Sequence, residues 1–433
     1  MQSPKDWTNF LNMAACYVGL GAPDLASLTL DQAYRLNPRD PEVHYMAGEI
    51  RRDDREFRTA ADSFMKALSL APEHHGAAYG LADCFLNLGD LEKAADILND
   101  LHRKRPESVR IIHGLSQLPE NMRSIDILSA IQNVKQMTDE SEEDFTSRLD
   151  FARGAALHDQ GRYAEAWEIL RKANTVEFRK HKSEYEASQL NRDGILKACR
   201  NAHPARPSSR MITFAEGAPI SLFILGVSRS GKTTLERCLS TIDGAIPGYE
   251  SHIVKEAVRR TSQKEGLPTI ENPIHLPAHL ADRFSEYYHS ELRSRTNGAR
   301  IFINTHPGLI SSVGALMQTI PNSRLIFIER DIYDTAIRIY LKKYKKKNFY
   351  SYNINAIFKQ IYWYNQMIKT WNEKFEKKSI IINYRDLFND NKECAFKISE
   401  LLRINLESIN IDNASNDIGC GKYYTNFFDS EKE

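Results

Sequence analysis

The side chains best suited to chemistry on an anion gather in one short loop. Residues 226–234 read Gly-Val-Ser-Arg-Ser-Gly-Lys-Thr-Thr, after an apolar run at 220–225 that predicts a buried strand. A helix is expected from about Leu235, and its positive dipole end favours an oxyanion that the glycines let the backbone N–H groups approach. The charged and hydroxyl side chains of the loop are Arg229, Ser230, Lys232, Thr233 and Thr234. These features predict a site for a phosphate or a similar group.

One interpretation of this loop is a nucleotide triphosphatase or kinase. The letters from Gly226 to Thr233 satisfy the pattern GxxxxGK[ST]. A protein of this class would require Mg²⁺ and ATP, and Glu329 or Asp386 would lie near the metal ion. The motif alone leaves this alternative open.

Further apolar runs predict the sheet that positions the loop. They lie at 301–303, 325–328 and 380–382 and alternate with segments of helical character, near Asp334 and at 392–402. Such alternation predicts a parallel sheet covered on both faces, in which ligands bind at the carboxyl ends of the strands. The residues that follow predicted strands, and so could share one site, are Arg229, Arg330 and Tyr384.

The first half of the chain repeats with a period of 34 residues. Small residues at fixed positions let paired helices approach closely, and a proline after the second helix of each unit ends it. The pattern resembles the tetratricopeptide repeat, which implies an α-solenoid with a concave surface for a protein or peptide partner. The recurring positions are Pro38, Pro72 and Pro106, Ala26, Ala60 and Ala94, and Ala14, Gly48 and Ala82, with a degenerate fourth copy at Gly154, Gly161 and Ala166. A second interpretation is a packing module that only supports the second half.

Composition sets the domain boundaries and excludes several classes of protein. Residues 201–219 are rich in proline, serine and alanine, so we expect a helical domain at 1–200, a linker at 201–219 and an α/β domain at 220–433. The net charge of +1 names no partner, and neither a leader nor an apolar run long enough to span a membrane is apparent. We therefore expect a cytoplasmic protein.

The second half resembles the sulfotransferase family, in particular bacterial proteins that join tetratricopeptide repeats to a sulfotransferase domain. These are similar to tyrosylprotein sulfotransferases. The fold class expected is an N-terminal tetratricopeptide α-solenoid followed by a P-loop-like, parallel-sheet sulfotransferase domain. The resemblance rests on the order of the loop at 228–236, Gly248-Tyr-Glu250, Arg330-Asp331 with Asp334, Tyr350-Ser-Tyr-Asn353 and Asn383-Tyr-Arg-Asp-Leu387.

The resemblance implies that 3′-phosphoadenylyl sulfate donates a sulfuryl group to an acceptor hydroxyl, without a metal ion. The acceptor would be a peptide tyrosine, a small molecule or a glycan. Glu250 would be the base, Arg330 and Arg338 would bind the 3′-phosphate, and Tyr384 would line the nucleotide pocket. The phosphosulfate would bind Arg229, Ser230, Gly231, Lys232, Thr233 and Thr234, with Arg229 and Lys232 also acting in catalysis.

Four positions depart from the family pattern. Ser228 stands for a proline, Lys232 for a threonine, Thr305 for a lysine and Arg338 for a serine. Lys232 could supply the charge that the absent lysine gives elsewhere. The departures also motivate a further alternative, a non-catalytic scaffold that keeps only the fold. Near the C-terminus, 418–422 is the candidate for the loop that closes over the nucleotide.

Two other features do not indicate a further ligand. Residues 340–378 hold ten lysines, six tyrosines and only two acidic residues, which favours a solvated face or a surface for an acidic acceptor over nucleic acid. The thirteen histidines form no metal-binding pattern.

Overall fold

The computed structural model describes most of the chain. The described residues are 7–20, 22–134, 136, 141–203, 205–267, 273–344, 348–411 and 418–431. Their contacts divide the chain into two units, 1–176 and 177–433. No helix in these ranges is long and apolar enough to cross a membrane.

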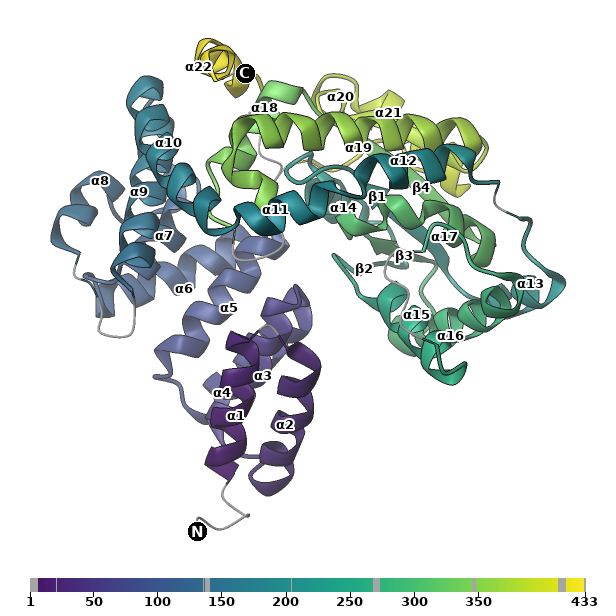
Figure 1. The fold of residues 1–433 in the computed structure, drawn as a ribbon, viewed down its shortest axis with the longest axis horizontal. Coiled ribbons are helices and arrows are strands. Elements are labelled where there is room, and N and C mark those ends of the chain that lie inside the picture. The colour runs from purple at the N-terminus through teal and green to yellow at the C-terminus, as the bar shows by residue number, and fades with distance from the viewer. Residues whose placement is uncertain are drawn as a thin grey trace. The chain divides into compact units, whose positions relative to one another are not determined.

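The first unit is built from helices that pack in sequence-adjacent antiparallel pairs (Figure 1). The 34-residue period is confirmed, because Pro38, Pro72 and Pro106 each lie two residues beyond the second helix of a pair. The three regular pairs are α1 (Trp7–Gly19) with α2 (Pro23–Leu36), α3 (Pro41–Asp53) with α4 (Phe57–Leu70), and α5 (His75–Leu88) with α6 (Leu91–Lys104).

Small residues at the repeated positions allow neighbouring helices to pack closely, as the sequence period predicts. The ring of Phe64 on α4 is fully buried and lies against the backbone of Gly48 on one neighbour and Gly80 on the other. A methyl group at either glycine would overlap this ring. The repeated alanines Ala60 and Ala94 are fully buried.

The degenerate fourth copy is also a helix pair, α9 (Glu142–Asp159) with α10 (Tyr163–Lys180). Gly154 on α9 packs against Leu170 on α10, and Gly161 turns the chain between them with a φ of 73°. Irregular elements precede this pair: α7 (Val109–Ser116), η1 (Glu120–Met122), α8 (Ile127–Ala130) and η2 (Ile131–Asn133).

The boundary between the units lies earlier than the predicted 200. The helices α11 (Lys182–Gln189) and α12 (Arg192–Asn201) belong to the second unit. Arg200 donates to Gln366 at 2.8 Å, and Trp363 donates to the carbonyl of Arg192 at 3.2 Å. These side-chain bonds tie α12 to the long helix α19 (Ile354–Lys374).

The segment predicted as a linker also packs on the second unit. Its helix α13 (Ser209–Ala215) begins after Ser208, whose hydroxyl accepts the N–H of Met211. The Met211 side chain is buried, and Arg293 donates to the carbonyl of Phe214 at 2.8 Å. The prolines of residues 201–219 therefore interrupt the helices of this segment, which still packs on the second unit.

A five-stranded parallel sheet forms the centre of the second unit, in the order β2-β3-β1-β4-β5. This confirms the predicted fold class. Its strands are β1 (Ile220–Leu225), β2 (Ala245–Pro247), β3 (Ile301–Asn304), β4 (Ser323–Glu329) and β5 (Ser379–Asn383). The four apolar runs are thus strands, and the sequence missed only β2, a three-residue edge strand that ends in proline.

Helices cover both faces of this sheet. One face packs on α14 (Lys232–Leu239) and α21 (Asn391–Leu402) through an aliphatic core that includes Leu222, Ile326 and Ile398. On the other face, Tyr288 of α16 (Ala278–Thr296) donates to the hydroxyl of Ser221 on β1. Helix α19 contacts β4 and β5, and Figure 1 shows it running along the sheet beside α12.

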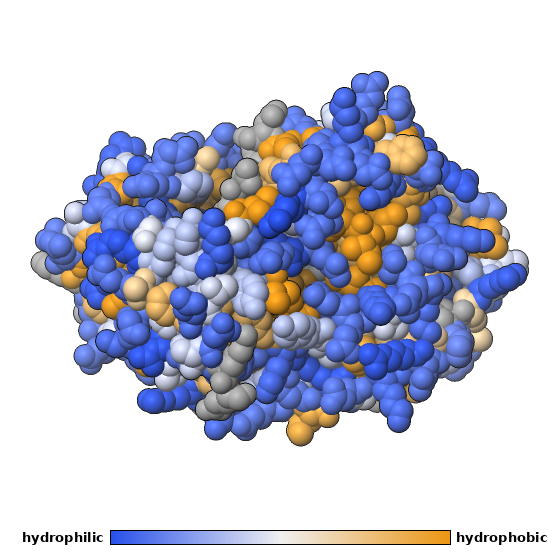
Figure 2. Space-filling model, turned by 90° about the horizontal axis from the view of Figure 1, so that it is seen from above, coloured by the Kyte–Doolittle hydropathy of each residue, from blue (hydrophilic) through white to orange (hydrophobic). Residues whose placement is uncertain are grey.

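The remaining elements of this unit connect the strands. They are α15 (Ile253–Lys264), η3 (Pro307–Ser312), α17 (Val313–Thr319), α18 (Ile332–Tyr340), η4 (Phe349–Tyr352), α20 (Asp386–Asn389), η5 (Cys420–Tyr423) and α22 (Thr425–Ser430). Hydrophilic residues dominate the face drawn in Figure 2, with hydrophobic ones gathered in limited bands.

Candidate functional site

The glycine loop joins β1 to α14, as predicted. Arg229 has a φ of 66° and Gly231 a φ of 105°. Positive φ is uncommon for a residue with a side chain, and such residues cluster in ligand-binding loops. Thr233 and Thr234 lie in the first turn of α14, at its positive dipole end. The loop can therefore hold an oxyanion with backbone N–H groups and hydroxyls.

The ring of Tyr384 lies directly on the backbone of this loop. The side chain is only 2% exposed, and a methyl group added at Gly231 would overlap the ring. The amide of Tyr384 donates to the carbonyl of Glu329 at 2.7 Å, which joins the ends of β4 and β5. Arg330 follows directly, and its guanidinium carbon stands 4.6 Å from the centre of the Tyr384 ring.

Three arginines lie near enough to one another beside the loop for their charges to interact. Burial, together with the nearby charges of Arg229 and Arg330, lowers the pKa of Arg338 to about 9. The guanidiniums come from the loop, from the end of β4 and from α18. Like charges held together disfavour the protonated forms, so an anion bound among them would be stabilised. The structure thus brings the three predicted arginines together.

Lys232 and Ser230 lie inside the loop. Lys232 is 6% exposed, and its amine donates to the carbonyl of Val227 at 2.9 Å. Its charge therefore lies behind the loop backbone. The hydroxyl of Ser230 is buried and makes no hydrogen bond with any described residue. A buried hydroxyl in that state can donate to a ligand.

Glu250 lies in a turn that is tied to the end of β3. The amide of Gly248 donates to Ile303 and the amide of Thr305 donates to Tyr249, both at 2.8 Å. A methyl group at Gly248 would collide with Phe302 and with the Ile303 carbonyl, so only glycine fits there. The half-buried Glu250 side chain is thus carried on a fixed turn near the loop.

Tyr364 connects the segment that follows β3 to the start of the loop. Its phenol donates to the carbonyl of Pro307 at 2.9 Å and accepts the amide of Gly226. Burial raises the pKa of Tyr364, and the nearby groups of Tyr350 and Glu250 raise it further. Tyr364 therefore stays a neutral phenol beside Glu250. A second tyrosine also contacts the loop: the hydroxyl of Tyr344 lies 3.0 Å from the hydroxyl of Ser228.

The C-terminal segment 418–421 lies against α18. The buried carboxylate of Asp334 accepts the amides of Gly419 and Gly421, both at 2.7 Å. The approach is so close that a side chain at Gly421 would overlap the backbone of α18. A cavity of about 330 Å³ lies beside this contact, and its lining includes Arg330, Asp334, Asn383, Tyr384, Arg385 and Ile418.

The acidic residues of the ATP alternative lie near the same strand ends. Burial raises the pKa of Glu329, and Asp386 lines the cavity just described. Within the described ranges, no three His, Cys, Asp or Glu side chains are grouped so as to hold a metal ion.

The described part of the basic stretch 340–378 contributes several buried aromatic side chains to the core. Tyr340, Tyr352 and Tyr364 are buried, and Lys374 and Lys378 donate to backbone carbonyls. These three tyrosines are thus packing residues of α18, η4 and α19, whereas Tyr362 on α19 is 53% exposed.

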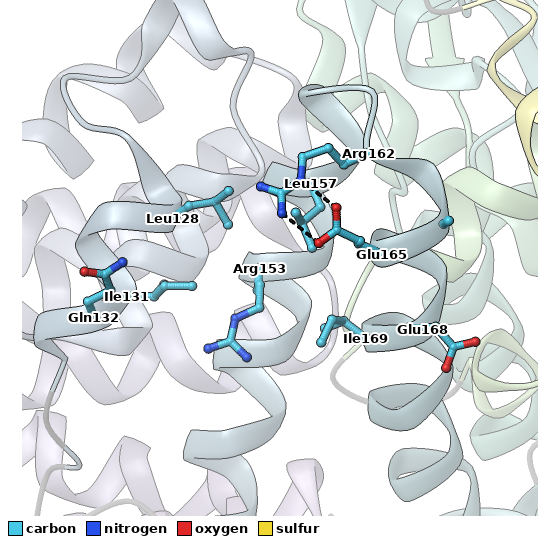
Figure 3. Close-up of a pocket in the computed structure, with 10 residues that line it drawn as sticks. Leu128, Ile131, Gln132, Arg153, Leu157, Arg162, Glu165, Glu168 and Ile169 are labelled. Atoms are coloured by element: carbon cyan, nitrogen blue, oxygen red, sulfur yellow. Dashed lines mark hydrogen bonds and ion pairs between the residues drawn. The ribbon is translucent and has the colours of Figure 1, made fainter.

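A second cavity, of about 580 Å³, lies in the helical unit between α8–η2 and the α9–α10 pair (Figure 3). Leu128, Ile131, Leu157 and Ile169 line it, and Arg153 lies among them. At its rim, Arg162 donates to both oxygens of Glu165, at 2.8 and 2.7 Å.

Sequence reasoning missed two residues that organise the site, Glu236 and Tyr364. Glu236 falls in the helix after the glycine motif, where an acidic residue is usually solvent-exposed. Tyr364 falls in a basic stretch without a motif. The pairing of Gly421 with Asp334 is long-range, and neither segment alone indicates it.

Comparison with known proteins gives the following results. Residues 219–408 match the model of the sulfotransferase family, and residues 52–118 match a tetratricopeptide repeat model. An uncharacterized protein of Aquifex aeolicus (strain VF5) is 20% identical over 413 residues. The match covers 92% of this chain, which spans about half (51%) of that relative's length.

The crystal structure of the sulfotransferase STF9 from Mycobacterium avium is also similar to this chain. The two are 12% identical with a TM-score of 0.27, and the match covers 69% of this chain and 90% of the other. Along the chain, a match to the tetratricopeptide repeat model is thus followed by a match to the model of the sulfotransferase family.

Proposed function

We propose that the second unit transfers a sulfuryl group from 3′-phosphoadenylyl sulfate to an acceptor hydroxyl. The observation that carries this proposal is the convergence of Arg229, Arg330 and Arg338 beside a glycine loop. The donor has two anionic groups, a 5′-phosphosulfate and a 3′-phosphate, and the site offers two adjacent places that suit them.

The loop suits the phosphosulfate. Backbone N–H groups from Ser230 to Thr233 and the hydroxyls of Ser230, Thr233 and Thr234 would donate to its oxygens. The buried hydroxyl of Ser230 is available for this purpose. Arg229 would bind from the exposed side of the loop, and Lys232 would add charge from behind it. Such fixed donors stabilise the charge of the transition state.

Arg330 and Arg338 suit the 3′-phosphate, because planar guanidiniums bind such oxyanions with two parallel hydrogen bonds. Tyr384 holds Arg330 against its ring and presses on Gly231, so the two anion sites keep a fixed spacing. The adjoining cavity with Asn383 and Ile418 would receive the nucleoside. ATP lacks a 3′-phosphate and would leave this arginine pair unused.

Glu250 would serve as the base. As the acceptor oxygen forms its bond to sulfur, the bond from sulfur to the 5′-phosphate oxygen breaks and 3′-phosphoadenosine 5′-phosphate leaves. The acceptor proton passes to the Glu250 carboxylate. Tyr364 and the β3 end hold the surroundings of this carboxylate in place.

Thermal unfolding with two ligands tests this assignment. A ligand that binds the folded state raises the unfolding midpoint. We expect 3′-phosphoadenosine 5′-phosphate to stabilise the protein and ATP with Mg²⁺ to do so less. Stabilisation by ATP with Mg²⁺ alone would replace this proposal by the kinase or triphosphatase, which the letters Gly231-Lys-Thr233 favour.

Turnover of labelled donor distinguishes an enzyme from a scaffold. Glu250→Gln keeps the shape of the side chain but removes the base, so we expect transfer to fall by about 10²-fold or more, with bisphosphate binding retained. Bisphosphate binding by a wild type that transfers to no acceptor hydroxyl would favour the non-catalytic scaffold.

The helical unit is proposed to bind a protein or peptide partner. The cavity at α8–η2, α9 and α10 supports this, because it combines an apolar lining with the charges of Arg153 and Glu168. We propose a cytoplasmic location. A peptide acceptor should have a higher KM with Arg153→Glu, whereas a small phenol should not, and equal effects on both would contradict the assignment.

A further inference from the structure

Glu236 is an acid buried one turn after the start of α14. It is 0% exposed, although glutamate is seldom buried without partners. One carboxylate oxygen accepts the amide of Tyr249 at 2.6 Å, and the other accepts the hydroxyl of Thr305 at 3.0 Å. Hydrogen bonds to a charged acceptor are about twice as strong as neutral ones.

These two bonds connect three segments. Tyr249 has a φ of 52°, which a side-chain-bearing residue adopts only under constraint, and it directly precedes Glu250. The carbonyl of Tyr249 in turn accepts the amide of Thr305, at the end of β3. The carboxylate, Tyr249 and Thr305 therefore form a closed set of hydrogen bonds between α14, the Glu250 turn and β3.

The geometry points to Glu236 as a positioning residue for sulfuryl transfer, which fixes the turn of the base Glu250 relative to the phosphate loop. This inference rests on the proposed function. The bonds of Glu236 to Tyr249 and Thr305 reach the turn and the end of β3, so its loss should alter the transfer step more than binding of the nucleotide. A misplacement of about 1 Å at a reacting group can cost about 10²-fold in rate.

The inference also gives Thr305 a role. Where the family has a lysine, this chain has a buried hydroxyl that completes the bonding of Glu236. Thr305→Val removes one of the two bonds and keeps the shape of the side chain. Thr305→Val should lower the transfer rate less than Glu236→Ala does. In the variant that carries both changes, Thr305→Val should lower the rate little beyond the effect of Glu236→Ala.

The test uses the full chain and labelled 3′-phosphoadenylyl sulfate with water as the acceptor, so that no acceptor need be known. The variants are Glu236→Ala, Glu236→Gln and Thr305→Val. Glutamine can still accept from Tyr249, and its amide can donate to the hydroxyl of Thr305. Ser240→Ala is the control, because this hydroxyl donates to the Glu236 carbonyl and leaves the carboxylate alone.

We expect Glu236→Ala to lower the single-turnover rate by about tenfold or more. The dissociation constant of the bisphosphate should change by less than about twofold. Glu236→Gln should recover most of the rate, and Ser240→Ala should match the wild type. An unchanged rate in Glu236→Ala, or an equal loss of rate and affinity, would overturn the inference.

Amide exchange separates failure of this inference from failure of the proposed function. If the wild type neither binds the bisphosphate nor consumes the donor, the proposed function fails and Glu236 positions no catalytic base. Faster exchange of the Tyr249 amide in Glu236→Ala would then show only a structural bond. If the wild type is active, unchanged exchange at Tyr249 overturns the positioning role by itself.

Discussion

Arg338 lies among like charges, and this determines how it should affect stability and binding. Burial and the charges of Arg229 and Arg330 disfavour its protonated form. Removing the Arg338 side chain should therefore raise the unfolding free energy of the unliganded protein and lower its affinity for the anion. A residue that binds a ligand at the expense of stability behaves in this way.

We predict that Arg338→Ser raises the free energy of unfolding of the unliganded protein by about 1 kcal/mol, or about 3 °C in the midpoint. The same variant should lose most of its stabilisation by the bisphosphate. Arg210→Ser, at an exposed position on α13, is the control and should change neither quantity. A less stable empty Arg338→Ser protein would contradict the account.

A pH dependence follows from the same arginine. Its pKa in the folded chain, about 9, lies well below the ordinary value of an arginine, so the unfolded state binds more protons above about pH 9. Its contribution to stability therefore rises with pH in this window. The difference in unfolding free energy between Arg338→Ser and wild type should shrink from about pH 8 to about pH 10.

Gly231 offers a second test at the residue scale. A methyl group there would both strain the backbone and collide with the Tyr384 ring, and a control glycine separates the two effects. Gly231→Ala would strain a positive φ and push the Tyr384 ring off the loop. We expect a loss of about 1–3 kcal/mol in stability and loss of bisphosphate binding. In Gly266→Ala, the φ of 65° is strained but no atom lies near, so binding should persist.

At the scale of elements, helix contact in the repeats depends on glycine in a way that one substitution can measure. Gly48→Ala would drive a methyl group into the buried ring of Phe64. We expect a destabilisation of about 1–3 kcal/mol, measured by denaturant unfolding of the helical unit. Gly19→Ala is the control, because no atom lies near that glycine; it should be neutral or stabilising.

The elements also show what the sequence could predict. The four longer strands each contain a continuous apolar run, so 220–225 and 301–303 could be recognised directly. Strand β2 could not, because it has three residues and pairs only with β3.

Within the site, the loop and Arg330 could be predicted, because residues that directly follow parallel strands lie at the same edge of the sheet. The bonds of Glu236 could not, because they join residues 13 and 69 positions apart through tertiary contacts. The same holds for Asp334 and Gly421, 87 positions apart.

For the whole molecule, the division at residue 176 predicts a ligand response confined to one unit. The bisphosphate should slow amide exchange in 177–433, above all at 226–234 and 418–421, and leave 7–134 unchanged. Hydrogen exchange of the full chain with and without ligand measures this. Protection in the repeats equal to that in the loop would contradict it.

The most direct test of the central claim is a calorimetric titration of 3′-phosphoadenosine 5′-phosphate into wild type and Arg330→Ala, with ADP as the comparator without a 3′-phosphate. The account predicts that wild type binds the bisphosphate at least about tenfold more tightly than ADP, and that Arg330→Ala removes this preference. Equal affinity for the two nucleotides in wild type, or a preference that survives in Arg330→Ala, would contradict it.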